Sequence, residues 1–185
     1  MDAKKLICVT GAPCSGKTKT LNLMREIVGY FDFHIVQESP TFLSQGENPL
    51  HSIPQHGPEQ QQFDSLVYHS RKYSAMEAVR RPEPIILFDR GTLDGAVYHE
   101  NFFEMMRTTR EEELKRYSAV ILMETMANVG KYCKDGTRWE DASLASEIHT
   151  KLQKLYGDHP NFIEIPAKLD SVRRLAMMLD FIDSI

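Results

Sequence analysis

Five short apolar runs divide the chain and are typical of buried β-strands. Each has few polar positions, so both faces of each run are suited to burial, as in a parallel sheet that helices cover on both sides. We therefore predict one strand for each run. The runs are Leu6–Thr10, Phe33–Gln37, Ile85–Phe88, Ala119–Met123 and Phe162–Ile165.

Between these runs, apolar residues recur with the period of amphipathic helices. One helix is predicted from about Lys17 to Val28 and a second from about Glu59 to Arg80, where Pro82 and Pro84 stop it. Near the end of the chain, the apolar positions of 169–182 fall on one helical face. Strands that alternate with helices predict an α/β fold, a doubly wound five-stranded sheet in a single domain.

Composition narrows the class of protein. The chain has 185 residues, of which 42% are hydrophobic and 26% charged, which is usual for a folded globular protein. A net charge of −4 provides no overall attraction to a nucleic-acid polymer or an anionic membrane. Three cysteines without metal-ligand spacing, and the lack of a signal-like or long apolar segment, lead us to expect a cytoplasmic protein with no membrane span.

The segment GAPCSGKT at Gly11–Thr18 matches the phosphate-binding pattern GxxxxGK[ST], between a predicted strand and a predicted helix. Gly11 and Gly16 would allow backbone conformations in which successive N–H groups point at phosphate oxygens. Lys17, solvated and unpaired without a nucleotide, would bridge the terminal phosphates, and the Thr18 hydroxyl would bind Mg²⁺. The alternative is a turn that only tightens a strand–helix corner. The residues expected to bind ATP or GTP are Gly11, Ala12, Pro13, Cys14, Ser15, Gly16, Lys17, Thr18 and Thr20.

Acidic residues stand at the ends of two predicted strands. Asp89 follows Ile85–Phe88, where a carboxylate would reach the ligand edge of the sheet and bind Mg²⁺; a helix-capping role is the alternative. Glu38 follows the second strand and is a candidate general base, although a surface position is also common for such a residue. Arg90 would contact substrate or phosphate, or form an internal ion pair.

Basic residues gather in the segment 128–138, between the fourth strand and a helix. Lys131, Lys134 and Arg138 lie there, as in the lids that close over the γ-phosphate in phosphoryl-transfer enzymes. The alternative for each lysine is a solvated turn. Arg138 is the candidate catalytic residue, because its planar fork suits phosphate oxygens.

Four stretches resemble one family in their order along most of the chain: GAPCSGKT, VQESPTFLSQG, ILFDRGTLDGAVY and TRWEDASLASEIHTKLQKLYGDHPNFIEIP. They are similar to the AAA-domain P-loop family that includes the kinase domain of bifunctional nicotinamide-nucleotide regulators and an insect protein that binds phosphoinositides and GTP. More distantly, the DRG turn is similar to a motif of thymidylate kinases, and the position of Glu38 to the base of deoxynucleoside kinases.

This resemblance implies a P-loop fold with strand order 2-3-1-4-5 and a Mg-nucleotide at the Gly11–Thr18 segment. It also implies that Asp89 lies near the metal, that Arg138 belongs to a basic lid, and that Asp94 faces the acceptor site. Members of the family bind different molecules, so the resemblance does not identify the molecule that would accept the phosphoryl group.

We expect a Mg²⁺-dependent kinase that transfers the γ-phosphoryl of ATP to a small molecule such as a nucleoside or nucleotide. The acceptor would lie between the proline-rich loop 39–58, the helix that follows it and the DRGTLDG turn. A guanine-reading NKxD motif is absent from the sequence. The alternative is a regulatory ATP- or GTP-binding module with a protein or phosphoinositide partner; a weaker one is a protein that binds nucleotide only to support an assembly.

Overall fold

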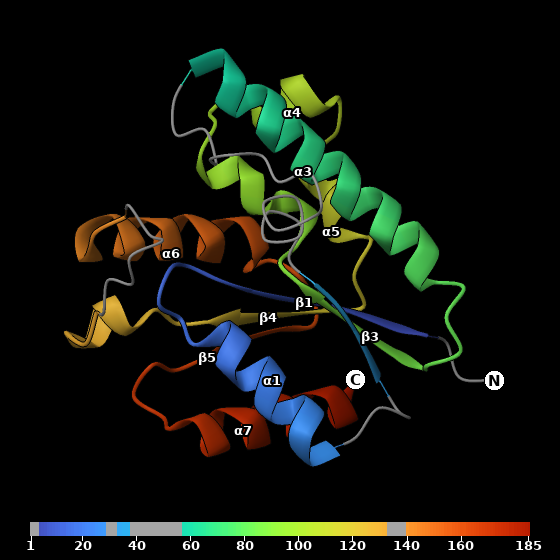
Figure 1. The fold of residues 1–185 in the computed structure, drawn as a ribbon, viewed down its shortest axis with the longest axis vertical. Coiled ribbons are helices and arrows are strands. Elements are labelled where there is room, and N and C mark those ends of the chain that lie inside the picture. The colour runs from blue at the N-terminus through green and yellow to red at the C-terminus, as the bar shows by residue number, and fades with distance from the viewer. Residues whose placement is uncertain (1–3, 29–32, 38–56, 133–139) are drawn as a thin grey trace, which may run out of the picture.

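A five-stranded parallel sheet forms the centre of the protein (Figure 1). The computed structural model describes residues 4–28, 33–37, 57–132 and 140–185. The strand order is β2-β3-β1-β4-β5, which confirms the order that the family resemblance implied. Each predicted strand is present, with ends within one residue of the prediction. The strands are β1 (Lys5–Gly11), β2 (Phe33–Val36), β3 (Ile85–Asp89), β4 (Ala119–Met123) and β5 (Phe162–Ile165).

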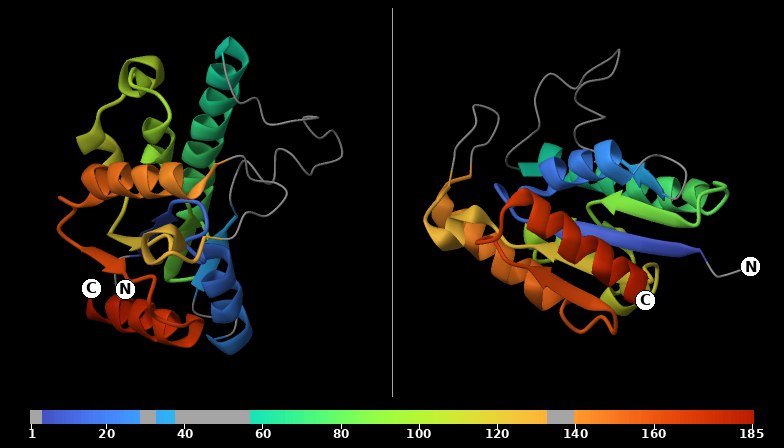
Figure 2. Two further views of the ribbon diagram at one scale, coloured as in Figure 1. Left: turned by 90° about the vertical axis from the view of Figure 1, so that its left-hand side faces the viewer. Right: turned by 90° about the horizontal axis from the view of Figure 1, so that it is seen from below.

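Helices cover both faces of this sheet (Figure 2). The α-helices are α1 (Lys17–Val28), α3 (Gly57–Ala78), α4 (Phe102–Met106), α5 (Arg110–Leu114), α6 (Ala142–Tyr156) and α7 (Ser171–Ser184). Two 3-10 helices are η1 (Thr92–Val97) and η2 (Met126–Val129). The helices α1 and α7 pack together on one face, and α3 and α6 lie on the other. No helix in the described ranges is long and apolar enough to cross a membrane.

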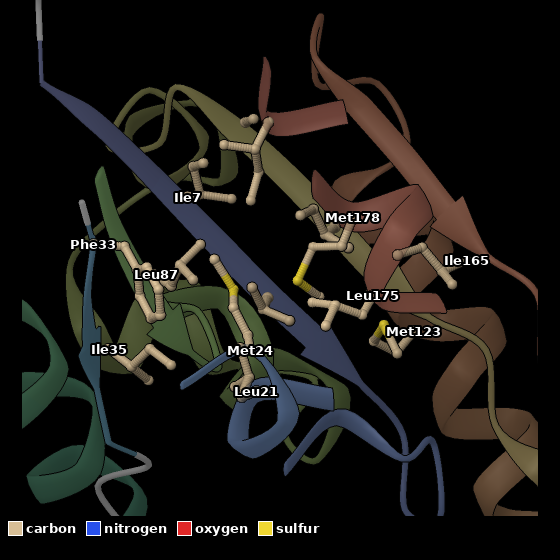
Figure 3. Close-up of a cluster of buried hydrophobic side chains, with 14 residues drawn as sticks. Ile7, Leu21, Met24, Phe33, Ile35, Leu87, Met123, Ile165, Leu175 and Met178 are labelled. Carbon is tan, nitrogen blue, oxygen red and sulfur yellow. The ribbon is translucent and has the colours of Figure 1, made fainter. Parts of the chain in front are cut away.

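The apolar runs are buried on both faces because their side chains alternate between two cores. In β1, Ile7 and Val9 pack toward α1 and α7, whereas Cys8 between them packs toward α6. Figure 3 shows the first core, in which Leu21 and Met24 of α1 lie among the strand side chains. This double burial is the physical reason that the strands contain almost no polar positions.

The segment between β3 and β4 contains short elements that the sequence pattern did not predict. Here η1, α4 and α5 follow one another, and each is only 5 or 6 residues long. The helix α5 begins with a capping box, in which the Thr109 hydroxyl accepts from the Glu112 N–H and the Glu112 carboxylate accepts from the Thr109 N–H. Local capping therefore forms a helix too short to show an apolar period.

A buried carboxylate joins α5 to α3. Glu113 is fully buried and accepts hydrogen bonds from the Tyr68 hydroxyl at 2.8 Å and the Thr108 hydroxyl at 2.7 Å. Arg116 pairs with the same carboxylate through its Nε at 2.6 Å. Burial by itself raises the pKa of Glu113, but the hydrogen bonds from Arg116 and the hydroxyl groups outweigh it and lower the pKa to about 2.

We expect Glu113→Gln to lower the free energy of unfolding at pH 7 by about 2 kcal/mol, because buried hydrogen bonds to a charged acceptor are lost. Since the folded-state pKa is lowered from 4.5 to about 2, this contribution is present above pH 4.5 and is lost as the pH falls toward 2. In urea unfolding at pH 7, 4 and 3, the free energies of unfolding of the wild type and of Glu113→Gln should therefore become more similar as the pH falls. Glu111→Gln, an exposed neighbour, is the matched control, and a constant difference across this pH range would contradict the assignment.

Candidate functional site

A cavity of about 720 Å³ opens where β1 ends and α1 begins. This is the carboxyl edge of the parallel strands, where ligands bind in open α/β sheets. Residues 12–20 form one side of the cavity, and the other sides come from the turns after β3 and β4 and from the start of α7. The remaining lining residues are Arg90, Met126, Lys131, Leu169, Asp170, Ser171 and Arg174.

The segment 11–18, called the phosphate loop below, is held from outside by η2 and the residue before it. The buried Thr125 hydroxyl donates to the Pro13 carbonyl at 2.6 Å. The next backbone N–H, that of Met126, donates to the Cys14 carbonyl at 3.1 Å. Two consecutive carbonyl groups of the phosphate loop are thereby bound by the segment after β4.

The other carbonyl groups of residues 11–16 also accept hydrogen bonds within the protein. The donor–acceptor pairs are Arg90 Nη1 to Gly11 O (3.1 Å), Ser15 N to Ala12 O (3.2 Å), Arg174 Nη1 to Ser15 O (2.5 Å) and Thr20 N to Gly16 O (3.0 Å). A trans peptide directs its C=O and N–H in opposite directions, so carbonyl groups that face the protein leave the N–H groups of Ala12, Cys14, Gly16 and Lys17 to face the cavity. Pro13 has no N–H, and the Ser15 N–H donates to the Ala12 carbonyl within the loop. This arrangement suits an anionic ligand.

The two glycines of the pattern are required for different reasons. Gly16 has φ of 76°, which confirms the expected need for a conformation that other residues disfavour. Gly11 is not in that region, so the expectation was wrong for this residue: a Cβ there would lie 2.6 Å from Ser15 Oγ and 2.7 Å from the Met123 carbonyl. Gly11 is therefore needed for space. Cys14 also has a positive φ, of 61°, and so stores backbone strain in the loop.

Lys17 and Asp89 form an ion pair at the cavity. The Lys17 side chain is 5% exposed and that of Asp89 is 11% exposed. The expectation that the Lys17 ammonium is solvated and unpaired without a nucleotide was therefore wrong. The physical reason is the pairing of β1 with β3, which brings the end of β3 beside the start of α1 and gives the buried cation a counter-ion.

Of the two expected Mg²⁺ ligands, Asp89 pairs with Lys17 and Thr18 follows Lys17 in the chain. Thr18 is exposed in the cavity wall in the first turn of α1, which carries no acidic residue of its own. A hydroxyl and a carboxylate are the hard oxygen donors that Mg²⁺ takes, with phosphate and water oxygens as the remainder. Among the described residues, no group of three or more His, Cys, Asp and Glu side chains could hold a metal ion by itself.

The turn after β3 connects Arg90 and Asp94 to the phosphate loop. Arg90 has φ of 78°, and its guanidinium contacts the Gly11 carbonyl and, at 3.4 Å, the Asp94 carboxylate. Asp94 is only 2% exposed and accepts from the Thr10 hydroxyl and the Tyr156 hydroxyl, each at 2.7 Å. The structure thus places Asp94 under the turn with protein donors on both oxygens, whereas the resemblance implied a position facing the acceptor.

This buried network fixes the protonation states beneath the turn. Burial, and then the charge of Asp94, raise the pKa of both the Cys8 thiol and the Tyr156 hydroxyl. Tyr156 therefore remains a hydrogen-bond donor to Asp94. A Cβ at Gly91 would collide with the Tyr156 hydroxyl and lie 2.7 Å from Cys8 Sγ, so the glycine lets the turn pack against this network.

Several of the expected site residues meet at the cavity, and others lie outside the described residues. The phosphate loop, Thr20, Asp89, Arg90 and Lys131 come together there. Glu38, Lys134 and Arg138 are outside the described ranges. Sequence reasoning missed Thr125 and Arg174, which hold the loop from elements distant in the chain; neither lies in a recognisable motif.

A parallel sheet in this order, with a GxxxxGK[ST] loop between β1 and α1, defines a P-loop nucleotide-binding protein. A model of the AAA domain matches residues 6–171, and the chain belongs to this family. Among curated proteins, no sequence matches the chain.

Two solved structures show that the whole fold recurs in another P-loop protein. One is a deoxyadenosine kinase from M. mycoides with the products dCMP and a flexible dCDP bound, with a TM-score of 0.64 and 14% identity over 97% of this chain and 100% of that one. The other is deoxyadenosine kinase from M. mycoides with bound dATP, with a TM-score of 0.59 and 12% identity over 96% and 99% of the two chains. At these identities the likeness concerns the fold.

We expect Lys17→Met to weaken binding of Mg-ATP at least tenfold, measured by calorimetry, because the loop loses its central cation. The same change leaves Asp89 without its partner and should lower the midpoint of thermal unfolding. The double variant Lys17→Met with Asp89→Asn removes both charges, and should recover thermal stability relative to Lys17→Met without recovering affinity. Wild-type affinity in a folded Lys17→Met protein would refute the role of this residue.

Proposed function

We propose that this protein is an ATP-dependent, Mg²⁺-requiring kinase that phosphorylates a small molecule of the nucleoside or nucleotide kind. The observation that carries the proposal is the phosphate loop with its carbonyl groups turned outward and Lys17 and Asp89 paired beside it. The similarity of the fold to the deoxyadenosine kinase supports it. GTP is the alternative phosphoryl donor.

On nucleotide binding, Lys17 would exchange Asp89 for phosphate oxygens. Asp89 and the Thr18 hydroxyl would then hold Mg²⁺, which neutralises phosphate charge when it is bound. Asp89 would serve as the counter-ion of Lys17 before the nucleotide binds, because a buried ammonium without any counter-ion would be costly. Chemistry would depend on positioning and charge neutralisation of the γ-phosphoryl group, supplied by the loop N–H groups and Lys17.

The acceptor would approach from the side of α3 and the turn after β3. Arg90 at this turn and Glu38 after β2 are the proposed acceptor-side residues, with Glu38 as the base or orienting group. Asp94 would act indirectly, since its carboxylate holds Arg90 and the turn. Arg138 would add positive charge from the lid segment. The described residues on either side of 133–139 are joined by a hydrogen bond from the Tyr132 hydroxyl to the Glu140 carbonyl at 2.8 Å.

A screen of acceptors tests the proposed activity directly. Nucleosides, nucleotides and sugars would be added singly to the protein with Mg-ATP, and ADP formation measured together with the phosphorylated product. A kinase should show at least one acceptor that stimulates ADP formation well above the basal rate and appears in phosphorylated form. Slow hydrolysis that no acceptor stimulates would contradict the kinase and favour the regulatory nucleotide-binding module.

With the acceptor identified, Glu38→Gln should lower turnover by about 10²–10⁴-fold, because a positioned general base is lost. The affinity for Mg-ATP should stay within a few fold, since the phosphate loop is unchanged. Asp89→Asn is the comparison variant and should change the Mg²⁺ dependence. If Glu38→Gln alters neither turnover nor affinity, the catalytic assignment of this residue fails; if it shifts the Mg²⁺ dependence as Asp89→Asn does, Glu38 is a metal ligand instead.

A further inference from the structure

Arg174 is a buried arginine that reaches the phosphate loop from α7. The residue is 4% exposed and lines the cavity. Its Nη1 donates to the Ser15 carbonyl at 2.5 Å, in the middle of the phosphate loop, although the two residues are 159 positions apart. No carboxylate in the described part of the chain lies within ion-pair distance of this guanidinium.

A buried guanidinium without an ion pair is unusual, because burial of a charge is costly unless the group is compensated. Burial lowers the pKa of Arg174, and the charge of Glu124 opposes this effect from a greater distance. An arginine nevertheless stays protonated in proteins, so a fixed positive charge stands at the wall of the cavity. Within the described residues its hydrogen-bond partners are neutral groups, so an anion in the cavity would add the opposite charge that these partners do not supply.

The contact with Ser15 also orients a particular N–H group. The Ser15 carbonyl belongs to the same peptide unit as the Gly16 N–H, and the peptide is trans. The N–H therefore points away from Arg174. A cation on the carbonyl oxygen also polarises the peptide and strengthens its N–H as a donor. Arg174 Nη1 lies 3.0 Å from the position that a Cβ of Gly16 would occupy, so the guanidinium packs directly against this peptide.

The remaining donors of Arg174 contact two other residues that line the cavity. Its Nε donates to the Leu169 carbonyl at 3.1 Å, and its Nη2 contacts Met126 Sδ at 3.4 Å. Leu169 precedes α7, and Met126 begins η2; both line the cavity. One side chain thus holds three segments of the cavity wall in a fixed relation.

We propose that Arg174 is a positioning residue for the triphosphate of the nucleotide: it fixes and polarises the Ser15–Gly16 peptide and contributes positive charge at the cavity wall. This inference rests on the proposed nucleotide binding but not on the transfer of a phosphoryl group. It concerns the phosphates, so a ligand that consists of phosphates alone should be affected as strongly as the nucleotide.

The test compares Arg174→Met, Arg174→Lys and Arg173→Met. Arg173 is the matched control because it is the neighbouring residue of α7 and is exposed. Among the described residues, its guanidinium forms an ion pair with Asp170 alone, at 3.6 Å. Dissociation constants for Mg-ATP and for inorganic tripolyphosphate would be measured by calorimetry in the absence of any acceptor. We expect Arg174→Met to weaken both ligands at least tenfold, Arg174→Lys to weaken both by a smaller factor, and Arg173→Met to stay within about twofold of wild type.

Thermal unfolding without ligand separates this role from a purely structural one. If Arg174 only stabilises the fold, the variants unfold at lower temperature but bind both ligands normally when folded, and the proposal is refuted. A loss confined to ATP, with tripolyphosphate unchanged, refutes it as well, since Arg174 would then serve the nucleoside part. If Arg174→Met fails to fold, the dissociation constants of Arg174→Lys decide the test. Lysine keeps the positive charge but loses the planar guanidinium that contacts Ser15 and Leu169, so wild-type affinity in this variant would refute the proposal. If wild-type protein binds neither ligand, the proposed function itself fails.

Discussion

The outward direction of the phosphate-loop carbonyl groups is the constraint on which the rest of the site depends. Each carbonyl from Gly11 to Gly16 accepts a hydrogen bond from the protein. A loop that kept these oxygens toward the cavity would repel an anion, whereas one that turns them outward presents N–H groups. The positive φ angles of Cys14 and Gly16 belong to this arrangement, since left-handed residues in a loop let nearby N–H groups converge on one concave side.

The order of the strands provides the donors that this loop needs. Because β1 lies between β3 and β4, the turns after these two strands flank the loop on either side. Arg90 comes from the first turn and Thr125 from the second, and α7 closes the third side with Arg174. Three segments distant in sequence therefore hold the conformation of the phosphate loop.

Local patterns were sufficient for the strands, the main helices and the phosphate loop. Runs such as Ala119–Met123 are buried on both faces, so their composition alone identifies them. The elements between β3 and β4 were missed because they are too short to show a period. Glu113 stands in an acidic run typical of a solvated surface, yet it is fully buried and accepts a hydrogen bond from Tyr68, a residue 45 positions earlier. Arg174 and the Lys17–Asp89 pair depend in the same way on contacts between residues distant in sequence, and local sequence patterns do not show such contacts.

The electrostatics of the cavity also differ from what the whole chain suggests. A net charge of −4 favours no anionic ligand, but the side chains that line the cavity include five cations and one carboxylate, namely Lys17, Lys19, Arg90, Lys131, Arg174 and Asp170. Charges in a concave wall are screened less than those on an open surface, so the local field attracts anions despite the net charge. Mutual repulsion among these cations is itself costly. The contact of Asp89 with Lys17 and that of Asp94 with Arg90 place negative charge beside two of these cations and so offset part of this cost.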